Sequence, residues 1–205
     1  MNAPRLVVLL ALCVAGVTIT QAQPDYPLAH WNPPPCVKYY TAGNGHQFCV
    51  IHDMEGYYEA SISYLNRCDT NSSGVYNVDA SVYYLINGIQ NGPGENDPSD
   101  PPAGDITQSV RESNYAWHVS CWNRWMFGTE HEGFVTSPIW YTEAMYQASA
   151  GLQRYLCTNY HIPMDRNHII GHNQWQNSTW TNWMRTNYPA IDTSCNNHTT
   201  LASVR

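Results

Sequence analysis

Charged side chains are scarce in this chain of 205 residues. Asp, Glu, Lys and Arg make up 12% of it, acidic residues outnumber basic ones by 16 to 9, and the formal net charge is −7. The sequence contains no cluster of lysine and arginine. Proteins that bind nucleic acids neutralise phosphates with such clusters, so this composition argues against a nucleic acid as partner.

Several motifs of metal and repeat proteins are also missing. No Cys-x-x-Cys pair occurs, which argues against a zinc site made only of cysteines. No His-Glu-x-x-His helix occurs either, because His131-Glu132 is followed by Gly133-Phe134-Val135. The sequence has no internal repeat, and its length suffices for one hydrophobic core. We therefore predict a single domain.

The one long apolar run lies at the start of the chain. A short positive stretch from Met1 to Arg5 precedes apolar residues 6–20, and Thr20-Gln21-Ala22 places small residues where a signal peptidase cleaves. The run is too short for a typical membrane span. We predict a signal peptide over residues 1–22, a secreted or periplasmic mature chain, and no membrane contact after cleavage.

Six cysteines remain after the signal peptide. An even number of cysteines in an exported chain predicts disulfide bonds, although the sequence does not choose among the pairings. The six positions are Cys36, Cys49, Cys68, Cys121, Cys157 and Cys195.

Residues 23–46 are predicted to form an extended N-terminal arm and an edge strand. Residues 23–35 are rich in proline and contain Trp31, which favours an arm laid over the domain. Residues 37–42 have strand composition, and Gly43-Asn44-Gly45 forms a turn.

Residues 47–205 form the main domain, in which strand-like and helix-like segments alternate. We predict strands at 47–51, 80–86, 106–111, 127–134 and 167–172, and helices at 57–65 and from the N-cap Ser137 to Cys157. Residues 91–104 read as a surface loop. The pattern predicts an α/β fold with a central mixed sheet flanked by helices.

Two distant histidines follow apolar runs at predicted strand ends. His52 ends the first run and His172 ends the last, and strand ends of an α/β sheet can bring such residues to one point. Neutral imidazoles are preferred zinc ligands, and zinc activates water toward an amide carbonyl. Glu130 is the best-placed carboxylate for proton transfer, but Glu132 shares its face in a regular strand. The sequence does not separate these two glutamates.

The other histidines are predicted to have structural or solvent-exposed positions. His168 lies four residues before His172 in a strand, so we interpret it as structural. His131 alternates away from Glu130 and is expected to be packed or exposed on the opposite face. Three further histidines lie in predicted loops and are expected to be solvated without partners: His30, His46 and His161.

Five short motifs occur in a fixed order along the chain. They are Val50-Ile51-His52-Asp53-Met54-Glu55-Gly56, Ser81-Val82-Tyr83-Tyr84, Ala116-Trp117-His118, Gly128-Thr129-Glu130-His131-Glu132-Gly133 and Ile169-Ile170-Gly171-His172. Together the motifs resemble the zinc-dependent N-acetylmuramoyl-L-alanine amidases of type 2, which share a fold with peptidoglycan recognition proteins. The resemblance covers about residues 48–199.

The resemblance implies roles for particular residues and for a metal ion. It implies that Zn²⁺ is bound by His52 and His172, that Glu130 shuttles the proton, and that His198 stabilises the oxyanion. It also implies contacts with the glycan and stem peptide of peptidoglycan at three residues: Trp117, His118 and Tyr84. We expect a monomer that binds peptidoglycan.

The chain departs from the family at its C-terminal tail. The resemblance places an acidic third zinc ligand where this chain has Thr200, two residues after His198, unless His198, Asp192 or another group substitutes. Tyr83 also stands where relatives often have histidine. Two functions therefore stay open: a secreted hydrolase that cleaves the amide bond between N-acetylmuramic acid and L-alanine, and a peptidoglycan-binding module of the same fold without catalysis.

Overall fold

The computed structural model describes residues 22–41 and 45–194, without the side chains of residues 192–194. The predicted signal peptide therefore lies outside the described residues except for Ala22, and His198 and Thr200 lie outside them as well. Within the described part, no helix is both long and apolar enough to cross a membrane.

The centre of the described structure is a mixed β-sheet, as the sequence predicts, and this sheet has six strands. Its order is β1 (His30–Trp31), β5 (Ile106–Gln108), β4 (Tyr84–Ile86), β7 (Met126–His131), β3 (Phe48–Asp53) and β8 (Ile169–Gly171). Strand β5 runs antiparallel to β4, whereas β4, β7, β3 and β8 are parallel to one another. A separate antiparallel pair consists of β2 (Tyr39–Thr41) and β6 (Asn114–Ala116).

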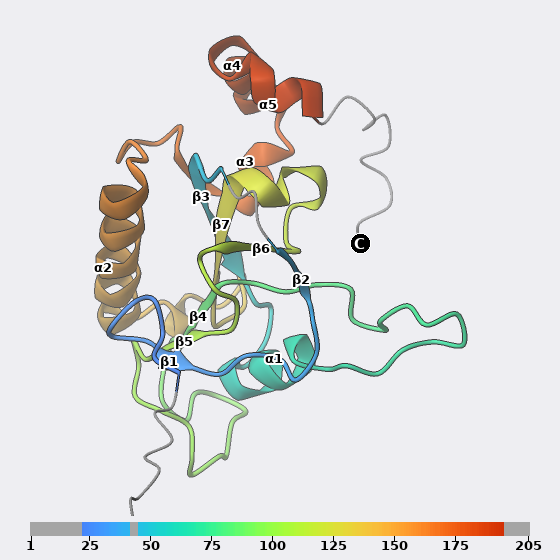
Figure 1. Cartoon of the computed structure of the whole chain (residues 1–205). Helices are drawn as coiled ribbons and strands as arrows, with labels where there is room; N and C mark the ends of the chain where they lie inside the picture. The colour runs from blue at the N-terminus through green and yellow to red at the C-terminus, as the bar shows by residue number, and fades with distance from the viewer. Residues whose placement is uncertain (1–21, 42–44, 195–205) are drawn as a thin grey trace, which may run out of the picture.

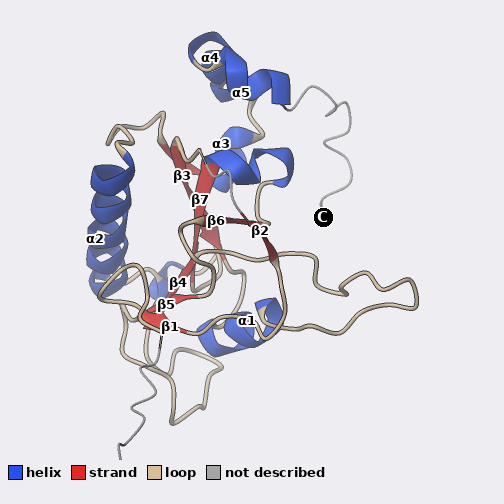
Figure 2. Cartoon of the chain, viewed as in Figure 1, coloured by secondary structure: helices blue, strands red, loops and turns tan. Residues whose placement is uncertain are grey.

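Helices cover both faces of the sheet (Figure 1, Figure 2). They are α1 (Tyr58–Leu65), α2 (Glu143–Tyr160), α3 (His172–Trp175), α4 (Ser178–Asn187) and α5 (Pro189–Ser194), with 3-10 turns η1 (Ser120–Trp125) and η2 (Pro138–Trp140). Figure 1 shows α2 along one side of the sheet and α1 and α3 on the other. Figure 2 shows that long loops connect these short elements.

Side-chain alternation along β3 divides the core into two layers. Cys49 packs with the buried residues of α2, whereas Phe48 and Val50 pack on the opposite face with the tryptophans of η1, α3 and α4. His52 continues the parity of Phe48 and Val50. Its side chain therefore emerges on the face away from α2.

The longest described helix begins later than the sequence predicts. Ser137 makes no capping bond, and Pro138 opens the short turn η2, which buries Trp140 at 2% exposure. Helix α2 then begins at Glu143, where the side-chain oxygen of Thr142 accepts the Met145 N–H at 3.2 Å. Residues 138–140, which propensity alone assigns to the first turn of the helix, thus form a 3-10 turn that buries Trp140.

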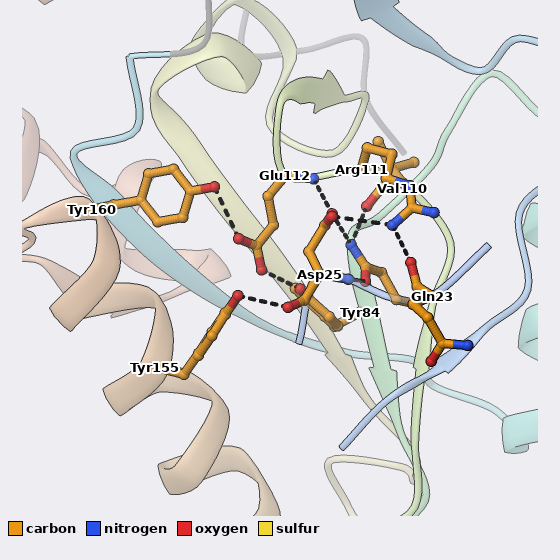
Figure 3. Close-up of polar contacts among 9 residues, drawn as sticks. Gln23, Asp25, Tyr84, Val110, Arg111, Glu112, Tyr155 and Tyr160 are labelled. Atoms are coloured by element: carbon orange, nitrogen blue, oxygen red, sulfur yellow. Dashed lines mark hydrogen bonds and ion pairs between the residues drawn. The ribbon is translucent and has the colours of Figure 1, made fainter. Parts of the chain in front are cut away.

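The N-terminal arm is part of the fold. Its β1 pairs with β5 at the edge of the main sheet, while the edge strand predicted at 37–42 forms β2 in the separate pair. The Asp25 carboxylate accepts hydrogen bonds from Gln108 Nε2 at 2.6 Å and from the Glu112 N–H at 2.8 Å (Figure 3). Arg111 lies 3.1 Å from the same carboxylate. These contacts fix the arm to the domain.

Disulfide bonds occur in the described structure, as predicted. Cys36 in the arm is bonded to Cys68 beyond α1. Cys121 is disulfide-bonded as well. Cys49 on β3 and Cys157 on α2 are free and buried.

Candidate metal centre

The parallel strands bring the two predicted histidines and one glutamate together. Their register pairs His52 with Glu130 and Ile51 with Gly171, so His172 follows directly at the same edge of the sheet. The Nδ1 atoms of His52 and His172 lie 2.7 Å apart. Oε1 of Glu130 lies 3.9 Å from Nδ1 of His52. Three side chains that are distant in sequence therefore converge on one point.

Burial shapes the protonation of these groups. It holds the pKa of His52 well below its usual value, helped by the neighbouring imidazoles of His118 and His172, and it also lowers the pKa of His172. Burial, assisted by the Asp53 carboxylate, raises the pKa of Glu130 to about 8. Both histidines are thus neutral at pH 7, which is the form that ligates metals.

The donor set fits a zinc ion. Two neutral imidazole nitrogens face each other, and Oε2 of Glu130 is buried without a hydrogen-bond partner in the described part of the chain. Tetrahedral zinc with Zn–N bonds of about 2.0–2.1 Å needs two nitrogens roughly 3.3 Å apart, slightly more than the rings have here. Within residues 22–41 and 45–194 no group of three potential ligands occurs. The two facing imidazoles are thus candidate ligands, and His198 and Thr200 lie outside the described residues.

Two hollows meet at this centre. The larger has a volume of about 770 Å³ and is lined by His52, Glu130 and His172 together with aromatic side chains: Tyr40, Tyr115, Trp117, Trp125 and Trp175. The smaller, of about 540 Å³, lies against α1 and is lined by Tyr57, Tyr64 and Phe134 among others. Glu130 and Leu65 line both hollows, so the two hollows adjoin at these side chains.

The structure separates the two candidate glutamates. Glu132 has no exposed surface, and its carboxylate accepts the backbone N–H groups of Tyr58 and Gly88 at 2.8 Å and of Ile89 at 3.2 Å. Strand β7 ends at His131, so the regular alternation does not continue to Glu132. Glu132 thus joins backbone segments, and Glu130 alone of the two faces the hollows.

The residues expected to contact substrate have different positions. Trp117 lines the large hollow, and its indole Nε1 is buried without a partner among the described residues. His118 lines the hollow too, but both of its ring nitrogens are within hydrogen-bond distance of protein atoms.

The structure corrects the expectation of a substrate contact at Tyr84. Its register partner on β7 is Thr129, which lies on the opposite face of the sheet from Glu130. The Tyr84 side chain has no exposed surface, and its hydroxyl donates to Glu112 beside the arm (Figure 3). A substrate in the hollows therefore does not reach it.

Sequence reasoning missed several residues of the large hollow. Tyr40 comes from the arm, while Arg124 and Trp125 come from η1. Asp53 follows His52 directly, lines the same hollow and accepts a hydrogen bond from the Tyr141 hydroxyl. Of these residues, only Asp53 could have been assigned to the site from the sequence, because it lies within the first motif next to His52.

Comparison with known proteins identifies the family of this chain. Residues 42–189 match the N-acetylmuramoyl-L-alanine amidase family, and the chain belongs to this family. The sequence is 35% identical over 133 residues to N-acetylmuramoyl-L-alanine amidase A of Achromobacter lyticus, covering 65% of this chain and 63% of that protein. The chain thus spans less than two thirds of the length of this relative.

A solved structure shows the same fold. The crystal structure of a selenomethionine derivative of AmpD superposes with a TM-score of 0.50 at 22% sequence identity. The match covers 71% of this chain and 81% of that one.

Proposed function

We propose that this chain is an exported zinc amidase that hydrolyses the bond between the lactyl group of N-acetylmuramic acid and L-alanine in peptidoglycan. The observation that carries the proposal is the meeting of His52 Nδ1 and His172 Nδ1 beside the Glu130 carboxylate, in a chain of the amidase family. The apolar start of the sequence and the Cys36–Cys68 disulfide support export to an oxidising compartment.

His52 and His172 are the residues that would hold the metal ion. A bound zinc supplies a Lewis acid, which lowers the pKa of water and polarises a carbonyl. Glu130 accepts a proton from the attacking water through the carboxylate that lies beside His52. Its pKa of about 8 suits proton transfer near neutral pH in both directions.

Glu130 also completes the reaction. As the tetrahedral carbon collapses, the carbon–nitrogen bond breaks, and Glu130 returns its proton to the departing nitrogen. The products are the carboxylic acid of the lactyl group, which then ionises in water, and the free amine of L-alanine. One carboxylate that takes and then gives a proton balances the hydrolysis without a second acid.

The two hollows suit a substrate that extends in both directions from the bond that is cleaved. Glu130 stands at their junction, where the scissile amide would lie, so glycan and stem peptide would each occupy one hollow. The linings are rich in aromatic rings, and sugars and peptides pack on such rings through their apolar faces.

The test is product analysis on purified peptidoglycan. Chelator-stripped protein should release no stem peptide, and added zinc should restore release of peptides with a new amino-terminal L-alanine, detected by mass spectrometry. Glu130→Gln should keep zinc and lose about 10²–10⁴-fold in rate, because proton transfer is removed. The exposed Glu143→Gln on α2 serves as control.

Two results would contradict the proposal. Equal cleavage by stripped and zinc-loaded protein would exclude the zinc mechanism. Binding of cell walls by zinc-loaded protein without cleavage would instead identify the chain as a peptidoglycan-binding module.

A further inference from the structure

The His118 side chain lies between the sheet and the candidate metal centre. Its Nε2 is 2.9 Å from the carbonyl oxygen of Met126, and its Nδ1 is 3.0 Å from Nε2 of His52. Both ring nitrogens are therefore occupied by protein atoms. Neither is left to bind a sugar or a peptide.

The partners of His118 determine which nitrogens carry hydrogen. A carbonyl oxygen only accepts, so Nε2 of His118 is the donor to Met126. A buried imidazole favours its neutral form, which has a single N–H, so Nδ1 of His118 is an acceptor. The donor to that acceptor is Nε2 of His52. His52 then has a lone pair on Nδ1, the atom that faces His172.

The surrounding chain holds His118 in this orientation. The ring packs against the backbone of Gly128, where an added Cβ would come within 2.6 Å of its Nδ1. The side-chain oxygen of Asn123 accepts the backbone N–H groups of His118 at 2.8 Å and of Val119 at 2.7 Å. Gly128 on β7 thus provides the space that the ring occupies, and Asn123 on η1 fixes the backbone that carries it.

We propose that His118 is a positioning residue, which locks His52 in the tautomer that presents Nδ1 to the metal ion. This inference rests on the proposed zinc site. Outer partners of ligating histidines commonly fix ring orientation and strengthen metal binding in this way. His118 therefore acts on the metal ion through His52.

The second histidine of the centre is held differently. Nε2 of His172 lies 3.4 Å from the exposed side-chain amide of Gln176, one turn later in the chain. With a lone pair on His52 Nδ1, the 2.7 Å contact requires that His172 donates from its own Nδ1 in the metal-free protein. Metal binding must then move this hydrogen to Nε2. The inference therefore predicts that the tautomer of His52 stays the same when metal binds and that the tautomer of His172 changes.

Nitrogen-detected NMR of the histidine rings in the whole, metal-free chain tests this prediction. We expect His52 to carry its hydrogen on Nε2 before and after zinc is added, and His172 to change from the Nδ1–H to the Nε2–H form. A His52 ring with hydrogen on Nδ1 in the metal-free chain would overturn the inference. This readout is obtained whether or not the wild-type chain binds zinc, so it is independent of the proposed function.

A pair of substitutions of similar size tests the link to metal affinity. His118→Leu removes the acceptor, whereas His118→Asn places an amide oxygen near the position of Nδ1. We expect the leucine variant to bind zinc about 10–100-fold more weakly and the asparagine variant to recover most of that loss, with circular dichroism unchanged. The exposed His161→Asn is the control.

Equal losses in the two His118 variants, or no loss in either, would overturn the inference. If the wild-type chain binds no zinc, the proposed function fails instead, and the metal-free NMR spectrum still decides the state of His52.

Discussion

His46 shows what burial does to a single imidazole in this protein. Its side chain is 4% exposed, its Nε2 lies 2.6 Å from the Tyr83 hydroxyl, and its ring stacks on Phe127 at 3.5 Å between centroids. Its Nδ1 has no hydrogen-bond partner among the described residues. Burial lowers the pKa of His46 to about 3, because a charged ring here would leave an N–H without an acceptor.

This lowered pKa predicts a dependence of stability on pH. The unfolded chain binds a proton at His46 near its ordinary pKa of 6.5, while the folded chain does not until about pH 3. The contribution of His46 is therefore complete above pH 6.5 and is lost as pH falls toward 3, with a slope of about 1.4 kcal/mol per pH unit at most. His46→Phe should flatten the fall in unfolding free energy between pH 6 and pH 4, measured by urea denaturation. Parallel curves for the variant and the wild type would contradict this assignment.

Sequence reasoning placed His46 in solvent, and this prediction was wrong. A position next to a turn says nothing about which rings close over it, and here Tyr83 and Phe127 come from two other segments of the chain. The glutamates show a similar limit. Alternation could not separate Glu130 from Glu132, because the difference lies in where β7 ends.

Helix α2 shows how tertiary packing overrides a local start signal. Ser137-Pro138 has the composition of a helix N-terminus, yet Trp140 is buried in a 3-10 turn and the helix begins six residues after Ser137, at Glu143. Thr142 provides the cap, and its hydroxyl also donates to the Gly88 carbonyl at 2.7 Å. The actual cap therefore links α2 to the loop after β4.

Alanine substitution of Ser137 and of Thr142 shows which of the two residues caps helix α2. Thr142→Ala should lower the unfolding free energy by about 1–2 kcal/mol, since a capping bond and a second hydrogen bond are lost. Ser137→Ala should change it by less than about 0.5 kcal/mol, because Ser137 makes no cap bond. Chemical denaturation measures both, and a larger loss for Ser137→Ala would reverse the assignment.

The elements that build the centre were the most predictable ones. The apolar runs that form β3 and β8 end close to His52 and His172, and the run that forms β7 carries Glu130. The sequence also predicts the strand that carries Tyr84. The face of the sheet on which the Tyr84 side chain lies, however, follows from the pairing of that strand with β7. The register between strands is a tertiary property and cannot be read from one segment.

At the scale of the whole molecule, strand order creates the centre. Placing β3 between β7 and β8 brings His52 together with Glu130, which lies 78 positions later in the chain, and with His172, which lies 120 positions later. The α/β pattern made this convergence predictable, because the carboxyl ends of parallel strands meet at one edge. The hollows were not predictable, since their walls come from the arm, α1 and η1.

Zinc titration of the metal-stripped chain and of two single variants, His52→Ala and His172→Ala, tests the central claim most directly. Our account predicts one tightly bound zinc per wild-type chain and loss of that zinc in each variant, because each removes one of two facing nitrogens. Variants that bind zinc as tightly as the wild type would show that these two histidines do not form the metal site.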